Sequence, residues 1–351
     1  MFFKRRNVSI IIICLFALFL TSCNISDKST NTVKPLTKSD FLLGTIIDIS
    51  LYDKQDEAII DKAFDRIKEI EAKMTISNAI TSEIIALNNA SGISEVKLSS
   101  DTFEVLESGK HYSELTDGRF DITIGSIVKL WNIGTDYAAV PAPDILEQKR
   151  KLINYKKLQL DRSKLTAKLD DKAMQVDLGA IAKGYAADEV SKVLKENGVQ
   201  HAVINLGGNV LTVGGNLQNK PWKIGIQDPF NLRGEYLGII TVQDETVVTS
   251  GTYERYFEQN GKKYHHILDP RTGYPVENDI ASVSIITKKS IDGDGNSTSV
   301  LLLGLAEGMK FIESQAGVDA IFVTYDKKLY VTSGIKDRFT LTNKEFTLMK
   351  N

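Results

Sequence analysis

Apolar and polar residues recur with two different periods along this chain. Between residues 55 and 74 the apolar positions, including Ile59 and Ile67, lie three or four residues apart, which predicts an amphipathic helix. The same spacing, bounded by capping residues and glycines, predicts further helices at 101–115 and 180–196.

Shorter runs with a period of two predict strands. The dipeptide Asn260-Gly261 separates two such runs, at 253–259 and 262–268, and is a strong signal for a hairpin with a two-residue turn. Because helices and antiparallel hairpins are mixed, the expected class is α+β rather than a regular βαβ sheet. The other expected strands are 44–51, 201–206, 222–227, 237–242, 246–249, 282–287, 320–324 and 328–332, with short helices at 298–303 and 306–314.

The first residues carry a different pattern. Basic residues at 4–6 precede an apolar run at 10–20, which is too short to cross a hydrocarbon core ~30 Å thick as a stable helix. The run ends in the tetrapeptide LTSC at 20–23, which resembles the lipobox of bacterial lipoproteins, whose cysteine carries a diacylglycerol. A plain secretory signal or a short anchor is the alternative interpretation.

The lipobox interpretation predicts three parts. Residues 1–22 are a lipoprotein signal peptide, residues 23–38 a flexible tether from a lipidated Cys23, and residues 39–351 one large domain. We therefore expect the protein to be lipid-anchored to the cell membrane, facing the extracytoplasmic side.

The composition and net charge of the chain limit the classes of partner that are expected. Charged residues make up 25% and hydrophobic residues 42%, as in ordinary globular proteins. With 43 Lys and Arg against 45 Asp and Glu, the net charge of −2 gives no basic field, so no nucleic-acid partner is expected. The only cysteines are Cys14 and Cys23, so the folded domain has no disulfide and depends on its core.

Two glycine-containing segments have the composition of binding sites. In the first, 117–123, Phe120 can offer a stacking surface and Asp121 can hydrogen-bond a heterocycle, although a simple helix C-cap is equally plausible. In the second, 176–185, a strand gives way to a helix whose first N–H groups would point at an anion. Lys183 in its first turn is disfavoured unless a phosphate or carboxylate compensates its charge.

Two loop motifs that these segments superficially resemble, a phosphate-binding P-loop and a calcium-binding EF-hand, do not match the residues. The segment 176–185 is not a P-loop, because Tyr185 follows the second glycine where Lys-Ser/Thr is required. The segment 292–298 is not an EF-hand, because its sixth position is Ser297 rather than glycine. Asp294 and Thr298 are nevertheless four residues apart, so on a helix they would share one face and offer hard oxygen ligands to Mg²⁺; a capped helix start is the alternative.

A further segment, 264–273, contains two of the four histidines. Because neighbouring strand residues point to opposite faces, at most one of His265 and His266 can face a given pocket. Residues 269–273 have the composition of a turn.

Taken in order, these segments resemble the FAD:protein FMN transferases, the ApbE family. The resemblance spans essentially the whole expected domain, and the ordered set is far more specific than any single motif. The matching positions are 43–45, 74–75, 82–83, Asn88, 118–123, 177–185, 205–209, 249–251, 266–273, Asp294, 297–298 and 303–304.

The resemblance implies a fold and a metal site. The fold is a T-fold-like α+β domain of two intimate lobes, with mixed or antiparallel sheets and flanking helices. Mg²⁺ would be bound by the Ala180 carbonyl and by the side chains of Asp294 and Thr298, with Ser297 adjacent. His266 would assist phosphoryl transfer, and Asp294 would be essential for catalysis. The implied FAD-binding positions are Leu43, Ser77, Arg119, Phe120, Asp121, Asp177, Lys183 and Ile267.

The sequence departs from the family pattern at three places. Leu43 stands where the family usually has methionine, and Ile76 and Ser77 stand where it often has an aromatic residue that stacks on the flavin. Asp294 lies between two glycines rather than between Ala and Leu, which we expect to loosen the metal loop.

The implied reaction transfers FMN from FAD to a Thr or Ser hydroxyl of a client flavoprotein and releases AMP. Clients implied by the resemblance are exported or membrane flavoproteins, such as subunits of redox-driven ion pumps. Two other functions stay open: a Mg²⁺-dependent FAD pyrophosphatase, which would make free FMN and AMP, and a non-catalytic flavin-binding lipoprotein.

Overall fold

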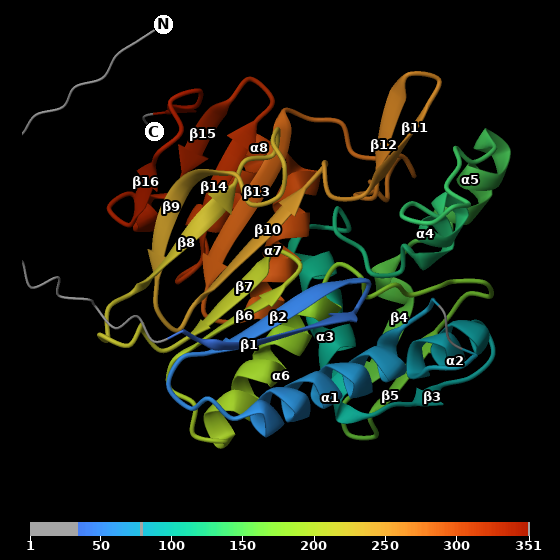
Figure 1. Cartoon of the computed structure of the whole chain (residues 1–351). Helices are drawn as coiled ribbons and strands as arrows, with labels where there is room; N and C mark the ends of the chain where they lie inside the picture. Colours follow the sequence, from blue (N-terminus) through green and yellow to red (C-terminus); the bar gives the residue numbers. More distant parts are fainter. Residues whose placement is uncertain (1–33, 78–79, 350–351) are drawn as a thin grey trace, which may run out of the picture. The chain divides into compact units, whose positions relative to one another are not determined.

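A mixed sheet of nine strands organises this computed structural model, which describes residues 34–77 and 80–349. Within these residues the strand order is β1-β2-β6-β7-β10-β13-β14-β15-β17, and every neighbouring pair is antiparallel except β15 and β17 (Figure 1). The strands are β1 (Leu36–Leu42), β2 (Thr45–Leu51), β6 (Ala202–Leu206), β7 (Asn209–Val213), β10 (Thr246–Gly251), β13 (Ile280–Thr287), β14 (Asp319–Thr324), β15 (Lys328–Val331) and β17 (Thr347–Leu348).

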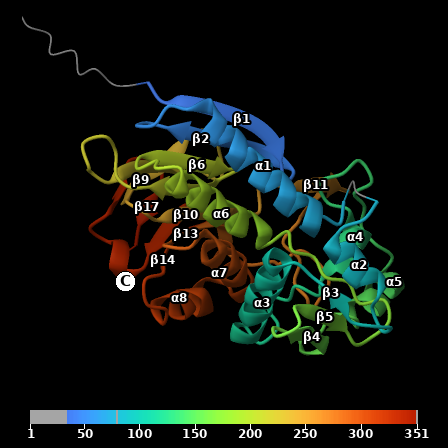
Figure 2. The ribbon, with the colours of Figure 1, turned by 90° about the horizontal axis from the view of Figure 1, so that it is seen from below.

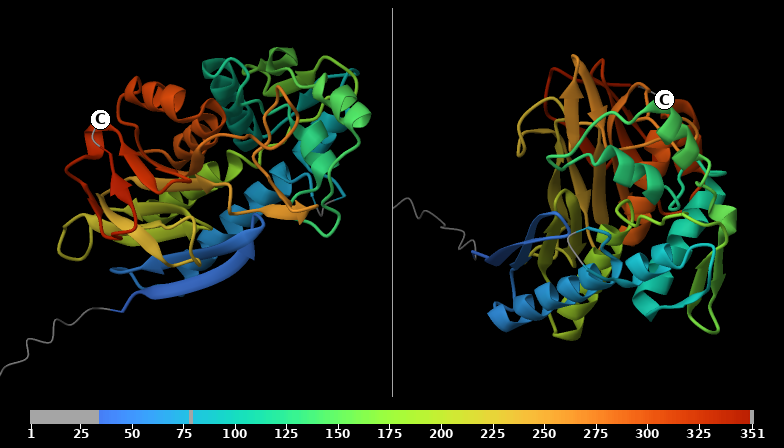
Figure 3. Two further views of the ribbon diagram at one scale, coloured as in Figure 1. Left: turned by 90° about the horizontal axis from the view of Figure 1, so that it is seen from above. Right: turned by 90° about the vertical axis from the view of Figure 1, so that its right-hand side faces the viewer.

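Helices cover one face of this sheet and a second, smaller sheet covers the other (Figure 3). All 8 residues of β13 are buried, because Val283 packs in the core on the helix side while Ile286 packs against the small sheet. The covering elements are α1 (Glu57–Met74), α6 (Ala182–Glu196), α7 (Ser290–Leu303) and α8 (Leu305–Glu313) on one side, and β8 (Trp222–Gln227), β9 (Tyr236–Val242) and β16 (Phe339–Leu341) on the other.

The remaining elements form two smaller groups beside the large sheet (Figure 1). One group combines a three-stranded sheet with helices. In the other, two short helices pack against a hairpin through Trp131. The indole N–H of Trp131 donates to the carbonyl of Gly273 at 2.8 Å. The first comprises α2 (Glu83–Asn89), α3 (Ser100–Leu115), β3 (Val96–Lys97), β4 (Leu158–Asp161) and β5 (Thr166–Leu169); the second comprises α4 (Gly125–Trp131), α5 (Pro143–Arg150), β11 (Tyr256–Gln259) and β12 (Lys262–His265). Short 3₁₀ turns cover Tyr155–Lys157 and Ser333–Ile335.

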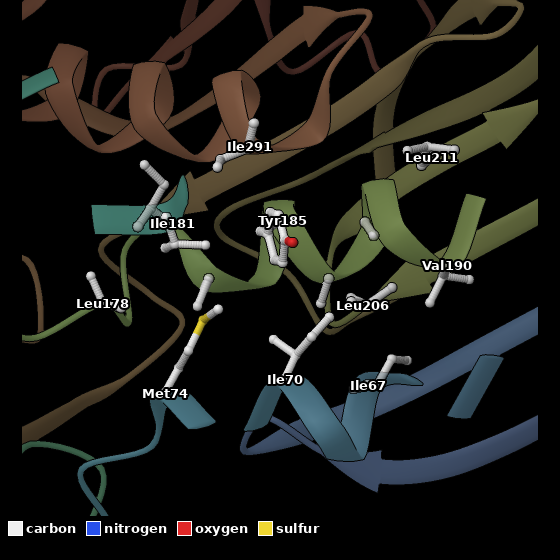
Figure 4. Packing of buried hydrophobic residues seen from close by; sticks show 14 of the residues in the cluster. Ile67, Ile70, Met74, Leu178, Ile181, Tyr185, Val190, Leu206, Leu211 and Ile291 are labelled. Carbon is white, nitrogen blue, oxygen red and sulfur yellow. The ribbon is translucent and has the colours of Figure 1, made fainter. Parts of the chain in front are cut away.

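Helix α1 packs along α6 and fixes the direction of that helix. Ile70 and Met74 point toward Tyr185 of α6 and toward Ile181, the N-cap residue of that helix (Figure 4), and Figure 2 shows α1, α6 and α7 side by side in this order. The Tyr185 hydroxyl also donates to the carboxylate of Asp101 at 2.7 Å.

Asp101 belongs to an ion network that joins α1, α3 and α6. Its carboxylate accepts hydrogen bonds from Arg66 at 2.7 and 2.8 Å and from Lys73 at 2.7 Å, and Arg66 also pairs with Glu189 of α6 at 2.5 Å. The hydrogen bonds from Arg66 hold the pKa of Asp101 far below its usual range. The start of α6 is therefore attached to the rest of the domain by both apolar and charged contacts.

The structure confirms the expected α+β class and most of the long elements. The helices at 55–74, 101–115 and 180–196 are present as α1, α3 and α6, and the Asn260-Gly261 hairpin is present as β11 and β12, shorter at both ends. The helix expected only from 298 begins at Ser290, so the segment 292–298 lies inside α7 and is not the loop that was expected.

Strand β1 begins at Leu36, ahead of the boundary expected at residue 39. The proposed signal peptide, Cys23 and the tether up to residue 33 lie outside the described residues. In the part of the chain that is described, no helix is both long enough and apolar enough to span a membrane.

Candidate active site

Helices α6 and α7 cap each other's N-termini. Neither helix has a side-chain cap from its own N-cap residue. Instead, the backbone N–H of Gly184 in the first turn of α6 donates to the Asp294 carboxylate of α7 at 2.6 Å. In return, the N–H groups of Ser290 and Ile291 at the start of α7 donate to Asp188 of α6 at 2.7 and 2.9 Å. The sequence predicted an anion at the start of α6, and in this structure the carboxylate of Asp294 takes that position.

Glycines allow this close packing. A Cβ added at Gly184 would overlap the carbonyl group of Ser290, so only glycine lets the two helices approach this far. A Cβ at Gly293 would overlap Val248 of β10, and one at Gly295 would overlap the ring of Tyr112 on α3. The expectation that the glycines beside Asp294 loosen a metal loop is therefore wrong: they let α7 fit tightly between β10 and α3.

Replacing Gly184 by alanine is expected to separate α6 from α7. The added methyl group meets backbone atoms, which cannot rotate away as a side chain can, and overpacking of this kind costs about 1–3 kcal/mol. Because the Gly184 N–H holds Asp294, we also expect loss of activity larger than the loss of folded protein. Chemical denaturation and specific activity of the folded fraction would measure both. Gly234→Ala, away from this site, is the control: a Cβ there meets nothing within 4 Å, so the variant has only the backbone strain of a positive φ of 100°.

Asp294 is buried and surrounded by donors. Its side chain is 4% exposed and lies 3.9 Å from the ammonium of Lys183, which thereby gains the compensating carboxylate that its place in a first helical turn requires. Burial raises the pKa of Asp294, while Lys183, Gly184 and Asn209 act in the opposite direction. The sequence had indicated Lys183 and Asp294 as parts of one site, and the structure brings them together.

Asn209 is a site residue that the sequence analysis missed. Its side-chain oxygen accepts hydrogen bonds from the hydroxyls of Ser290 at 2.7 Å and Thr246 at 3.3 Å, which turns its NH₂ group toward Asp294 at 3.4 Å. Asn209 is 1% exposed. It lies within the matched segment 205–209, but a buried amide at the start of a strand gives no signal of its own in the sequence.

The residues around Asp294 fit a hard divalent cation. Within the described chain, the carbonyl of Ala180 and the hydroxyl of Thr298 have no hydrogen-bond partner, so both keep lone pairs for a ligand. The Ser297 hydroxyl is engaged, donating to the Asp294 carbonyl at 3.0 Å and contacting the Ser250 hydroxyl at 2.8 Å. Carboxylate, carbonyl and hydroxyl oxygens are the donors that Mg²⁺ takes, completed by water and substrate phosphates.

No cluster of three or more His, Cys, Asp and Glu side chains that could bind a metal occurs in residues 34–77 and 80–349. The oxygen-donor set around Asp294, with a single carboxylate, is suited to a cation that also binds phosphate.

His266 lies just beyond the end of β12 and is held by the main chain of Arg255. Both the His266 backbone N–H, at 3.1 Å, and its ring Nδ1, at 3.2 Å, contact the Arg255 carbonyl oxygen. A carbonyl can only accept, so Nδ1 carries the proton and Nε2 keeps its lone pair. Burial, followed by the positive charge of Arg255, lowers the pKa of His266 to about 3. The ring is therefore a neutral base at ordinary pH.

The neighbouring histidine has a structural role. His265 is 8% exposed; its Nε2 lies 3.0 Å from the Val276 carbonyl and its Nδ1 accepts the N–H of Ile267 at 3.3 Å. The two histidines thus face different surroundings, as the strand pattern required. Ile267, one of the predicted FAD contacts, is itself 6% exposed and packs in the core.

Two further predicted FAD contacts, Asp177 and Lys183, interact electrostatically with the surroundings of His266. Asp177 is partly buried and accepts the Gly179 N–H at 2.7 Å; burial raises its pKa, and the charge of Arg255 acts against that rise. The charge of Lys183 acts on the ring of His266. Electrostatic interactions thus connect residues from three separate stretches of sequence: Asp177 and Lys183, His266, and Asp294.

Leu43 and Ser77 lie on turns beside α1. Leu43, with φ of 52°, and Gly44, with φ of 69°, form the two-residue turn between β1 and β2, and the Leu43 N–H donates to Glu71 of α1 at 3.0 Å. Ser77 is exposed and forms a local turn with Thr75. Ser77 is thus open to solvent, whereas Leu43 is half-buried and packs against the core.

The segment 117–123 is placed differently from what was expected. Phe120 is 2% exposed and packs edge-on against Tyr112 in the core, so the expected stacking surface is not presented. The Asp121 carboxylate accepts hydrogen bonds from the N–H and hydroxyl of Thr123 at 2.8 and 2.6 Å and from the N–H of Tyr155 at 2.9 Å. Its acceptor positions are largely used within the fold, so its side chain holds the loop.

Arg119, in the same segment, points to another part of the surface. It lies 3.5 Å from Glu307 and lines a cavity of about 440 Å³ together with Asp269 and Arg271. The structure therefore does not bring its side chain to Asp294 through any described contact.

A model of the ApbE family matches residues 43–322. The chain belongs to the ApbE family. The resemblance seen in the ordered motifs is thereby confirmed. Among ApbE proteins, the FAD:protein FMN transferase of Klebsiella pneumoniae (strain 342) is 39% identical over 302 residues, 86% of this chain and 93% of that protein. The FAD:protein FMN transferase of Treponema pallidum (strain Nichols) is 34% identical over 332 residues, 90% of this chain and 92% of that protein.

Solved ApbE structures have the same fold. The ApbE protein of Thermotoga maritima superposes with a TM-score of 0.79 at 28% identity, covering 87% of this chain and 99% of that one. The flavin transferase ApbE of Vibrio cholerae gives a TM-score of 0.77 at 26% identity, with the same coverage of 87% and 99%. The α+β architecture of mixed, mostly antiparallel sheets with flanking helices is therefore that of the ApbE family.

Proposed function

We propose that this chain transfers FMN from FAD to a threonine or serine hydroxyl of a client flavoprotein and releases AMP. Family membership and the names of the relatives support FAD:protein FMN transfer. The structural observation that supports the proposal is the meeting of α6 and α7: Gly184 donates to Asp294 at 2.6 Å, Lys183 lies 3.9 Å from it, and the Ala180 carbonyl, four residues before Gly184, accepts no hydrogen bond within the described chain. Nothing else in the described residues offers this combination for a pyrophosphate with its cation.

In this reaction the client hydroxyl oxygen attacks the phosphorus on the FMN side of the pyrophosphate. A new P–O bond forms to the client, the P–O bond to AMP breaks, and the hydroxyl proton passes to Nε2 of His266. The ring can take this role because its Nδ1 proton is held by the Arg255 carbonyl, which leaves the lone pair of Nε2 to accept a proton. AMP leaves with the electron pair of the broken bond.

Ala180, Asp294 and Thr298 would bind Mg²⁺, which when bound neutralises charge on the phosphate oxygens. The chain's own residues prepare this place in three ways. The Gly184 N–H orients one carboxylate oxygen of Asp294, Asn209 faces the other, and Lys183 supplies a positive charge next to both. Because these groups are fixed before a ligand arrives, little reorganisation is required when charge develops.

The direct test is to incubate the purified protein with FAD, Mg²⁺ and a candidate client domain. Covalent flavin fluorescence on a denaturing gel and a client mass raised by one FMN unit are the expected results. Free FMN and AMP with no labelled client, across a panel of exported flavoprotein domains, would instead establish a pyrophosphatase. Absence of AMP release would leave a flavin-binding protein.

We also propose that Cys23 anchors the protein to the outer face of the cell membrane, on the basis of the lipobox-like tetrapeptide at 20–23. Replacing Cys23 by alanine is expected to abolish incorporation of a clickable fatty acid while the domain keeps its activity in solution. Unchanged lipid labelling in the variant would exclude this cysteine as the anchor.

A further inference from the structure

Arg255 is the one arginine among the described residues that has no carboxylate partner within 4.0 Å. Each of the others forms an ion pair: Arg66 with Asp101 and Glu189, Arg119 with Glu307, Arg150 with Glu147, Arg162 with Glu107, Arg233 with Glu254, Arg271 with Asp269 and Arg338 with Glu245. Arg255 is exposed, and its guanidinium donates only to the Gly44 carbonyl, at 3.4 Å. Most of its five N–H groups therefore remain available to a ligand.

The position of Arg255 is set by its surroundings. Its side chain lies against two residues without side chains, Gly44 in the β1–β2 turn and Gly134, so nothing covers it there. Its main-chain carbonyl holds both the N–H and the Nδ1 of His266. Arg255 lies in the turn between β10 and β11, and its main chain thus connects the guanidinium to His266, the proposed base.

The carboxylate of Asp177 is influenced by the charge of Arg255 but forms no ion pair with it, so the guanidinium remains available to another anion. The charge of Arg255 acts on both Asp177 and His266, and the charge of Lys183 also acts on His266. Lys183 is already compensated by Asp294, whereas Arg255 has no comparable partner. A guanidinium is planar and matches two oxygens of a phosphate, which makes an uncompensated arginine beside a nucleotide site a suitable phosphate ligand.

We propose that the Arg255 guanidinium binds the non-bridging oxygens of the FMN-side phosphate of FAD. This inference rests on the proposed function and identifies which phosphate the residue contacts. In an in-line displacement the base stands on the side of the attacking hydroxyl, opposite the leaving AMP. The Arg255 main-chain carbonyl holds the His266 ring, so we expect the Arg255 guanidinium on the attacked side, within reach of the phosphate that is transferred. Asp294 and Lys183 remain for the cation and the rest of the pyrophosphate.

The test compares FMN with riboflavin, which differ only by this phosphate. Binding to the full-length protein would be followed by the change in flavin fluorescence for the wild type, Arg255→Gln and Arg255→Lys. We expect Arg255→Gln to weaken FMN binding about 10- to 100-fold, as for loss of a charge-assisted hydrogen bond, and to leave riboflavin and AMP binding unchanged. Arg255→Lys should retain part of the affinity.

Arg233→Gln is the matched control, because it removes the same charge from an exposed arginine that pairs with Glu254, the neighbour of Arg255. It should leave FMN binding unchanged. Equal weakening of FMN and riboflavin in Arg255→Gln would indicate a structural role through His266 and overturn the assignment, as would unchanged FMN binding. A wild-type protein that binds neither FMN nor FAD would overturn the proposed function itself, and this assignment with it.

Discussion

Replacing Asp294 by alanine is expected to lower FMN transfer by about 10³-fold or more. Asp294 is the only carboxylate among the predicted metal ligands, and it also accepts the Gly184 N–H that holds α6 against α7. The variant therefore loses both the charge that would attract Mg²⁺ and the cap of α6. Transfer to a client, measured with Mg²⁺ at a limiting concentration, would show the effect most clearly.

Asp294→Asn separates these two losses. Asparagine keeps the shape of the side chain and can still accept the Gly184 N–H, but it lacks the charge, so a fold close to the wild type with transfer still strongly reduced is expected. Added Mg²⁺ should raise the unfolding temperature of the wild type and not that of Asp294→Asn, because a ligand stabilises only the protein that binds it. Normal client labelling by either variant with limiting metal would refute the metal assignment.

Replacing His266 by alanine is expected to slow FMN transfer by about 10²–10⁴-fold while FAD binding stays nearly normal. The reason is that the ring supplies a proton acceptor at Nε2 and does not carry the binding charges, which lie on Arg255 and Lys183. His266→Asn is the matched variant, since its amide can donate to the Arg255 carbonyl from the position of Nδ1 without offering a base. A parallel loss of binding and transfer in both variants would argue for a structural histidine.

The same residue gives a pH prediction for the wild type. A general base acts in its neutral form, and burial together with Arg255 lowers the pKa of His266 to about 3. The rate should therefore not rise as the pH passes through 6 to 7, where an ordinary histidine loses its proton. A profile of the transfer rate from pH 5 to pH 8 would check this, and an acid limb near pH 6.5 would contradict the environment described for His266.

The sequence predicted the elements whose local pattern agrees with their packing. Residues 55–74 carry one apolar stripe, and α1 buries that stripe against α6. Asn260-Gly261 adopts positive φ at both positions, at 54° and 73°, as its turn requires. In these places local preference and tertiary contacts favour the same structure.

Helix α7 shows why the local sequence pattern did not predict every element at its full length. Its first two turns contain Gly293 and Gly295 with several Asp, Ser and Asn residues, which favour turns when considered alone. They are helical because the surroundings compensate: Asp188 caps the start, and the glycines fit against Val248 and Tyr112. Such compensation comes from residues far away in the chain, so the local pattern cannot reveal it.

The sequence predicted those site residues that belong to recognisable motifs, and it did not predict the others. The ordered motifs indicated that Asp294 and the start of α6 belong together, which the Gly184 contact now supports. Arg255 carried no such mark, and Asn209 was given no role although it lies in the matched segment 205–209, because a single arginine in a turn and a single buried asparagine are ordinary in composition. Their importance follows only from what each contacts, or in the case of Arg255 from the carboxylate that it lacks.

The mutual capping of α6 and α7 has a consequence for biosynthesis. The Gly184 N–H and the Asp294 carboxylate are separated by 110 positions in the chain, so their contact closes a long loop that costs entropy before it forms. A nascent chain that ends before Ser290 lacks both the carboxylate and the partner for Asp188. The proposed binding site for the cation and FAD should therefore be complete only after synthesis has passed α7.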